Sequence, residues 1–150
     1  MKLALGPLLY YWPRQSVLDF YAGIAESSVN SVYLGETVCS RRHELRLADW
    51  LEVAEMLAAA GKEVVLSSQV LVESESDLKT LRRIIDNGRF RVEANDMGAV
   101  HLLSGGDSPA RDWVAGPTLN IFNPATLGLF ADLGATRWAA PPEMSRQQIA

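Results

Sequence analysis

The stretch EVVLSSQVLVESESDLKTLRRIIDNGRFRVEAND, residues 63–96, changes its hydrophobic pattern twice and so predicts how the chain folds. It opens with a short apolar run at Glu63–Ser68, continues with a helical pattern at Ser76–Asp86 and returns to a short apolar run at Phe90–Ala94. Acidic residues stand in the first turn of the helical segment and arginines in its later turns, as the helix dipole favours, and Gly88 follows its end. The stretch therefore predicts a strand–helix–strand unit.

The same alternation extends through the rest of the sequence. Because the strand-like runs are apolar on both faces, and because parallel strands need a helical crossover, the pattern predicts a parallel sheet covered by helices. No Gly-x-Gly-x-x-Gly follows the first strand and no P-loop lysine motif occurs, which disfavours a nucleotide-binding doubly wound sheet. We therefore predict an α/β fold of the (β/α) TIM-barrel-like kind. The other predicted strands are residues 2–8, 31–35, 113–119 and 137–140, and the other predicted helices are residues 17–25, 48–60, 97–103 and 124–133.

The pattern contains about six βα units, whereas a (β/α)8 barrel contains eight and usually takes roughly 200 residues or more. The last segment, EMSRQQIA, reads as the opening of a sixth helix with Ser145 as its cap. We therefore expect residues 1–150 to form the N-terminal part of one barrel-like domain that is incomplete here, with the remainder of the domain missing.

The composition argues against a nucleic-acid partner, a membrane span and an internal disulfide. A net charge of −4 and a pI near 5.2 argue against a nucleic-acid partner, which would need a basic surface. The apolar N-terminus is interrupted by Pro7 and Pro13 and is too short to span a bilayer. A single cysteine cannot form an internal disulfide. We expect a cytoplasmic protein with no membrane span.

Polar residues follow five successive predicted strands. Ligands of parallel α/β folds bind at the carboxyl ends of the strands, so these residues predict a pocket there. Asp96 and Asn123 could equally cap the helices that they precede. Glu93 is harder to explain structurally, because a buried unpaired carboxylate costs several kcal/mol; its structural explanation would be an ion pair with a neighbouring arginine. The candidate pocket residues are Glu36, Arg41, Glu93, Asn95, Asp96, Asn120 and Glu143, with Thr37, Ser67, Ser68 and Gln69 at the same strand ends.

Cys39, the one cysteine, lies in YLGETVCSRRHELR, residues 33–46, just beyond a predicted strand end. The cations Arg41 and Arg42 would favour its thiolate form. Three interpretations remain open on the residues alone: a nucleophile with His43 as base, a metal ligand, and a half-buried loop thiol, of which only the last needs no partner. His101, within AVHLL, is more typical of a packed or surface histidine than of a ligand.

Three stretches together resemble the collagenase-like peptidase family, whose members have a (β/α)-barrel-type core. They are VYLG followed closely by an arginine, VEANDMGAVHLL, and LNIFNPATLGLFADLGATRWAAPPEMS. The last stretch carries the family's Asn-x-x-Asn, Leu-Gly-Ala/Val-x-Arg and Glu-x-Ser spacing, and the likeness extends along the whole chain. The matching residues are Asn120, Asn123, Arg137, Glu143 and Ser145.

Within that family, MKLALGPLLYYWPR, YLGETVCSRRHELR and VEANDMGAV resemble a branch that acts in oxygen-independent ubiquinone biosynthesis. That resemblance implies a 4Fe–4S cluster held by four cysteines, a heterodimer with a related protein, and a part in the anaerobic hydroxylation of the ubiquinone precursor ring. Of the four ligands, one matches this sequence, at Cys39, and the other three fall outside it.

The chain departs from the family pattern at the sixth strand end, where it has Pro142-Glu143-Met144 and many members have Arg-Glu-Leu. This departure argues against peptidase activity, as does the lack of a Ser-His-Asp set or a His-Glu-x-x-His motif. Two alternatives to the iron–sulfur subunit stay open. One is a peptidase or hydrolase that uses Cys39 or the strand-end carboxylates with a metal, and the other is a non-catalytic half that binds a homologous partner.

Overall fold

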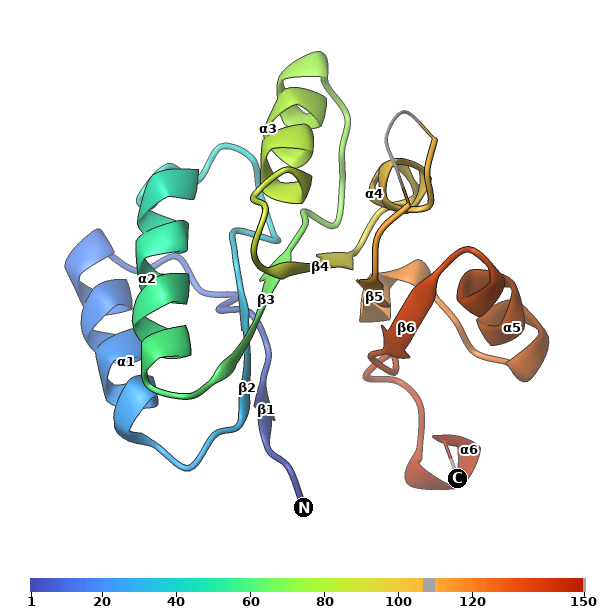
Figure 1. The fold of residues 1–150 in the computed structure, drawn as a ribbon, viewed down its shortest axis with the longest axis horizontal. Coiled ribbons are helices and arrows are strands. Elements are labelled where there is room, and N and C mark those ends of the chain that lie inside the picture. The colour runs from blue at the N-terminus through green and yellow to red at the C-terminus, as the bar shows by residue number, and fades with distance from the viewer. Residues whose placement is uncertain (107–109, 150) are drawn as a thin grey trace.

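The fold is a six-stranded parallel sheet whose strands lie side by side in chain order, from β1 to β6 (Figure 1). The computed structural model describes residues 1–106 and 110–149. The sheet curls into a half-barrel, so the prediction of an incomplete TIM-barrel-like fold is confirmed. The strands are β1 (Ala4–Leu5), β2 (Ser31–Leu34), β3 (Glu63–Ser67), β4 (Arg91–Ala94), β5 (Trp113–Ala115) and β6 (Ala135–Trp138).

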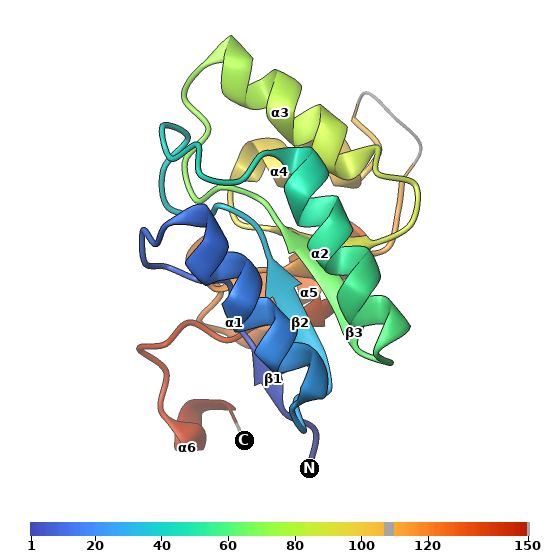
Figure 2. The same cartoon turned by 90° about the vertical axis from the view of Figure 1, so that its left-hand side faces the viewer.

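A helix follows each strand, as right-handed parallel crossovers require, and Figure 2 shows α1 and α2 side by side across β1 to β3. Ser145 caps the last helix as predicted, because its Oγ accepts the Gln148 N–H at 3.4 Å. The helices are α1 (Arg14–Glu26), α2 (Leu47–Ala59), α3 (Glu75–Ile85), α4 (Met97–Leu103), α5 (Pro124–Asp132) and α6 (Arg146–Ile149), with a short 3-10 helix, η1 (Pro117–Leu119), after β5.

The sheet is apolar on both faces. Val32 and Leu34 of β2 belong to the large core between the sheet and the helices. Tyr33, which lies between them, points the other way and packs with Val65 and Val114 in a second buried cluster. Strands buried on both faces are typical of parallel sheets, which explains the continuous apolar runs of the sequence.

Three predicted strands, the first, fifth and sixth, differ from the structure by two or more residues. The first strand ends at Leu5 instead of residue 8, because Gly6 and Pro7 follow and proline has no N–H for the ladder. The fifth ends at Ala115, because Pro117 suits the first position of a 3-10 helix. The sixth begins at Ala135, directly after Gly134, whose φ of +98° ends the preceding helical segment.

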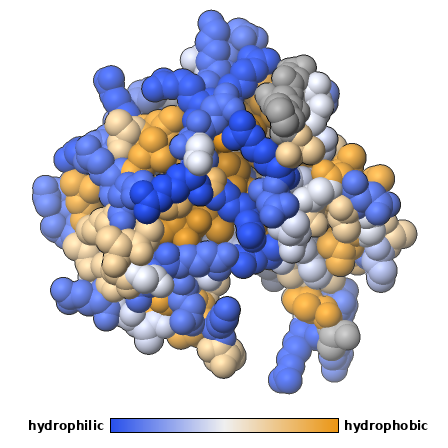
Figure 3. Space-filling view, in the orientation of Figure 1, coloured by the Kyte–Doolittle hydropathy of each residue, from blue (hydrophilic) through white to orange (hydrophobic). Residues whose placement is uncertain are grey.

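None of the helices in the described ranges is long and apolar enough to cross a membrane. Figure 3 shows apolar and hydrophilic side chains interspersed on the face seen in Figure 1.

Candidate functional site

The carboxyl ends of β2 to β5 lie on one rim of the sheet and are joined by backbone hydrogen bonds. The N–H of Ser68 donates to Glu93 O at 2.9 Å, the N–H of Val70 donates to Thr37 O at 2.9 Å, and the N–H of Gly116 donates to Ala94 O at 2.9 Å. Because all strands are parallel, the segments that follow them meet here, as the sequence predicts.

Asn95 is the centre of a buried polar cluster on this rim. Its Nδ2 donates to Glu93 Oε2 at 3.0 Å and to Ser68 O at 3.1 Å, and its own N–H donates to Ser68 Oγ at 2.9 Å. Thr118 completes the cluster from η1, because its Oγ1 donates to Asn95 O at 2.7 Å. The structure therefore brings Glu93 and Asn95 together and fixes both by contacts from neighbouring strand ends.

The Glu93 carboxyl is 2% exposed and has no cationic partner within the described ranges, so the ion-pair explanation was wrong. Burial disfavours the charged form and raises the pKa of Glu93 above the usual glutamate value, while the facing Ser67 hydroxyl and the Asn95 amide partly oppose that rise. A carboxyl whose pKa is raised by burial is typical of general acids and bases.

Within the described ranges, two buried hydroxyls at the rim lack a hydrogen-bond partner of good geometry. Ser67 and Thr37 are each 2% exposed, and Ser67 pairs with Glu93 in the register of β3 and β4. Buried hydroxyls normally find a partner, so these two have spare hydrogen-bonding capacity.

Thr118 is a rim residue that sequence reasoning missed. It falls inside the segment predicted as the end of the fifth strand, where its side chain would have had no particular role. The Gly116-Pro117 pair was the available signal, because a glycine–proline step marks the end of a strand. Gly116 is also required sterically, since a Cβ there would lie 2.1 Å from Asn95 Oδ1.

Cys39 is half-buried in the β2–α2 loop. Both its backbone N–H and its backbone C=O form hydrogen bonds. Glu36 Oε1 accepts the N–H groups of Val38 at 2.9 Å and of Cys39 at 3.2 Å. The N–H of Arg42 donates to Cys39 O at 3.1 Å. The side chain of Glu36 therefore shapes this loop, which gives it a structural role at the rim.

The neighbours of Cys39 do not form a nucleophile–base pair. The Arg42 guanidinium donates to Leu9 O at 2.9 Å and lies 5.5 Å from the centre of the Tyr11 ring, whereas Arg41 and His43 are exposed. In the part of the chain that the structure describes, no hydrogen bond joins His43 to Cys39, and no group of three or more His, Cys, Asp or Glu side chains could hold a metal ion.

The remaining candidate pocket residues do not join the buried cluster. Asp96 and Asn123 are helix caps, as one interpretation predicted: Asp96 Oδ1 accepts the Gly98 N–H at 2.7 Å, and Asn123 Oδ1 accepts the Thr126 N–H at 2.9 Å. Asn120 adopts the left-handed conformation, with φ of 57°, where η1 ends. Glu143 is exposed in the segment between β6 and α6.

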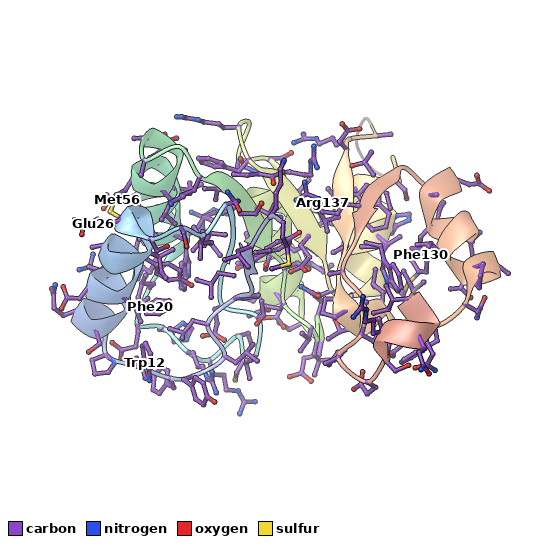
Figure 4. All side chains as sticks on the ribbon, turned by 90° about the horizontal axis from the view of Figure 1, so that it is seen from below. Trp12, Phe20, Glu26, Met56, Phe130 and Arg137 are labelled. Carbon is purple, nitrogen blue, oxygen red and sulfur yellow. The ribbon has the colours of Figure 1, made fainter. Side chains whose placement is uncertain are left out.

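A second polar arrangement spans the concave face of the sheet. Arg137 of β6 donates to Glu63 Oε1 of β3 at 2.8 Å and to the Tyr33 hydroxyl of β2 at 3.5 Å. Figure 4 places Arg137 near the middle of the curled sheet and Phe130 of α5 on its outer side. The ion pair with Arg137 and the Ser31 hydroxyl at 2.7 Å hold the pKa of Glu63 below its usual range.

Comparison with known proteins identifies the family of the chain. A sequence model of peptidase family U32 matches residues 18–150, which include every residue of the buried cluster and the Cys39 loop. No solved structure matches the chain significantly. The chain therefore belongs to peptidase family U32, the collagenase-like peptidase family.

Proposed function

We propose that this chain is part of a UbiV-type protein, a cytoplasmic 4Fe–4S subunit that pairs with a UbiU-like homologue and acts in the oxygen-independent hydroxylation of a ubiquinone precursor. The observation that carries the proposal is the stretch YLGETVCSRRHELR, whose cysteine stands on the rim where barrel folds bind ligands. The hydrogen bonds to the Cys39 backbone support the proposal, because a loop fixed by Glu36 and Arg42 can present a thiolate in one position.

Cys39 fits the role of one cluster ligand, and the chain provides no second cysteine. A 4Fe–4S cluster is held by four thiolates, so in this proposal the other three come from outside these 150 residues. When bound, the cluster would supply electron transfer. The chain's own contributions would be the Cys39 thiolate as ligand and, on the same rim, the Glu93 carboxyl as the group that holds a proton.

The test is Cys39→Ser in the protein that carries the remaining ligands, produced anaerobically together with its UbiU-like partner. Serine has nearly the volume of cysteine but replaces a soft thiolate with a hard hydroxyl, so iron, sulfide and visible absorption should fall sharply while the far-ultraviolet circular dichroism changes little. Ser40→Ala, one residue away, is the matched control and should keep the wild-type iron content. Wild-type iron in the Cys39→Ser protein would remove Cys39 from the ligand set.

Two further measurements on the same material separate the alternatives. Residues 1–150 produced alone under the same conditions should bind no cluster, because they provide one thiolate. Peptide hydrolysis that persists without iron and disappears in a Glu93→Gln or Cys39→Ser variant would favour a hydrolase instead.

A further inference from the structure

Exposed apolar side chains gather in the loops that follow the first three strands. Residues 9–12 of the β1–α1 loop are all exposed, and so are Val38 of the β2–α2 loop and residues 70–71 of the β3–α3 loop. We call these residues the apolar rim. In the described loops that lead from helices back to strands, at the opposite end of the sheet, Leu133 is the one large hydrophobic residue that is exposed. The apolar exposure is therefore concentrated at the end of the sheet where Cys39 lies.

Hydrogen bonds join the three loops of the apolar rim into one surface. The Arg42 guanidinium donates to Leu9 O at 2.9 Å, which attaches the β1–α1 loop to the β2–α2 loop. The N–H of Val70 donates to Thr37 O at 2.9 Å, which attaches the β3–α3 loop to the same segment. Figure 2 shows the β1–α1 and β2–α2 loops next to each other beyond the first turns of α1 and α2. The loop of Cys39 therefore lies between two loops that expose apolar side chains.

The aromatic side chains of the apolar rim are held by contacts within the chain. Tyr10 and Trp12 stack with their ring centres 6.3 Å apart, and Trp12 meets Phe20 of α1 edge to face at 5.6 Å. Figure 4 shows Trp12 and Phe20 as neighbours beside α1. The Tyr11 hydroxyl donates to Glu44 Oε1 at 3.2 Å. Side chains that are fixed before binding lose little conformational entropy when a partner packs on them, which favours affinity.

The charges beside the apolar rim are balanced. Arg41 of the β2–α2 loop and Glu73 of the β3–α3 loop are exposed and form no ion pair in the described ranges. An anionic lipid surface would favour an excess of positive charge, whereas this distribution suits a protein with an acidic group opposite Arg41 and a basic group opposite Glu73. Besides His43, the charged residues of the three loops are Arg41, Arg42, Arg46, Glu36, Glu44 and Glu73.

The area of the apolar rim is close to one side of a protein interface. Large side chains of this kind present roughly 150–250 Å² each when fully exposed, so the exposed fractions leave on the order of 700 Å² in contact with water. A standard interface buries about 800 Å² of each partner. Tyrosine, tryptophan and arginine, which the apolar rim and its edge contain, are the residues that most often dominate the binding energy of such interfaces.

We propose that the apolar rim is the surface on which the second subunit docks. That subunit is a related barrel-like protein whose matching surface has an apolar, aromatic-rich centre and an acidic side chain opposite Arg41. This inference rests on the proposed function, which supplies the identity of the partner. Tyr10 and Leu71 are the main anchors, from the loops on either side of the Cys39 loop. Docking there also covers Val38, the residue before Cys39, and so limits the access of water to that loop.

The experiment measures the dissociation constant of the complex between the protein that carries the remaining cluster ligands and its UbiU-like partner, produced anaerobically, by sedimentation velocity over a range of concentrations. Tyr10→Ser and Leu71→Ser should each weaken the complex by about tenfold or more, which is the usual effect of removing an anchor of an interface. Leu129→Ser is the matched control, because Leu129 of α5 and Leu71 are both 58% exposed and Leu129 lies outside the apolar rim. The control should leave the dissociation constant unchanged.

The outcomes separate this inference from the proposed function. If the wild-type complex forms and neither Tyr10→Ser nor Leu71→Ser weakens it, the inference is overturned and the proposed function stands. If the wild-type protein does not bind the partner at all, the heterodimer of the proposed function is itself overturned, and this inference with it. Far-ultraviolet circular dichroism checks that the variants fold. If Tyr10→Ser does not fold, Leu71→Ser decides, because its side chain is largely exposed.

Two other occupants of the apolar rim are tested with the same variants. Sedimentation of the wild-type protein without its partner shows whether a second copy binds. Co-sedimentation with vesicles of phosphatidylcholine and phosphatidylglycerol shows whether a lipid surface binds. We expect neither to occur. Self-association or vesicle binding that Leu71→Ser abolishes and Leu129→Ser preserves would overturn the inference in favour of that occupant.

Discussion

Glu93 shows how one residue can depart from the usual preference of its type. Glutamate is rarely buried without a cation, yet Glu93 is 2% exposed and its partner is the amide of Asn95. The neutral carboxyl is cheaper to bury than the carboxylate, which is why its pKa is raised. A protein tolerates such a residue at a cost in stability, and such costs are common at functional sites.

Replacing Glu93 with glutamine should stabilise the protein at neutral pH. The pKa of Glu93 is raised in the folded state, so its contribution to stability is greatest below the unfolded-state pKa and is lost as the pH rises through the folded-state pKa. Glutamine keeps the shape and never ionises. The Glu93→Gln variant should therefore melt at a higher temperature than wild type at pH 8, with the difference disappearing near pH 4.

Thermal denaturation of the variant and of wild type at pH 4, 6 and 8 checks this prediction. Above the folded-state pKa, the difference between their free energies of unfolding should amount to about 1.4 kcal/mol for each unit by which the pKa of Glu93 is raised. Glu143→Gln is the control, because Glu143 is exposed and its replacement should leave the melting temperature unchanged at every pH. A Glu93→Gln variant less stable than wild type at pH 8 would mean that the carboxylate is the favoured form.

At the scale of the elements, the strands are short and their ends are specified by backbone geometry. Gly35 directly follows β2 with φ of +144°, and a Cβ at this position would lie 2.6 Å from Ser67 O of β3. The chain leaves the sheet at Gly35 and enters the loop that contains Cys39. The end of the neighbouring strand β3 lies in close contact with Gly35. The residue that ends β2 therefore also sets where the loop begins.

Gly35→Ala should destabilise the protein by about 2–4 kcal/mol, from the strained backbone conformation and the clash with β3 together. Gly23→Ala in α1 is the matched control, because Gly23 is exposed with open space around it and alanine favours the helix. That variant should be more stable by about 0.5–1 kcal/mol. Urea denaturation of both variants measures the change in the free energy of unfolding, which should be negative for Gly35→Ala and positive for Gly23→Ala. Equal changes in the two variants would show that the contact with Ser67 is unimportant.

At the scale of the whole molecule, Arg137 joins the late part of the chain to the early part. The ion pair with Glu63 bridges residues 74 positions apart and crosses the concave face from β6 to β3. The same guanidinium reaches the hydroxyl of Tyr33 of β2, which belongs to the buried cluster with Val65 and Val114. Side chains that meet across the inside of a curled sheet are typical of barrel interiors.

The coupling between Arg137 and Glu63 should be modest, about 0.5 kcal/mol, because both side chains are more than a third exposed. A double-mutant cycle with Glu63→Gln, Arg137→Gln and the double variant, measured by urea denaturation, isolates it. The pKa of Glu63 is lowered in the folded state, so the coupling is present above the unfolded-state pKa and is lost as the pH falls through the folded-state pKa. It should also shrink in 1 M sodium chloride, and a salt-independent coupling would contradict the ion-pair explanation.

Much of the fold was predictable because its signals are local. Apolar runs alternating with helical patterns indicated six parallel strands in chain order, and the glycines and caps at helix ends were visible as residue types. The strand ends carrying Glu93 and Asn95 followed from the parallel arrangement alone. Cys39 was noticed because it is the one cysteine and because its surroundings resemble a known family.

The partners of these residues were decided only by the tertiary structure. Asn95 contacts Ser68 and Thr118, which lie 27 and 23 positions away, and the ion pair expected for Glu93 did not form. Period-two and helical patterns report which face a side chain occupies. They do not report the register between strands or how far a side chain reaches across a curled sheet, and these two quantities determine which polar groups meet.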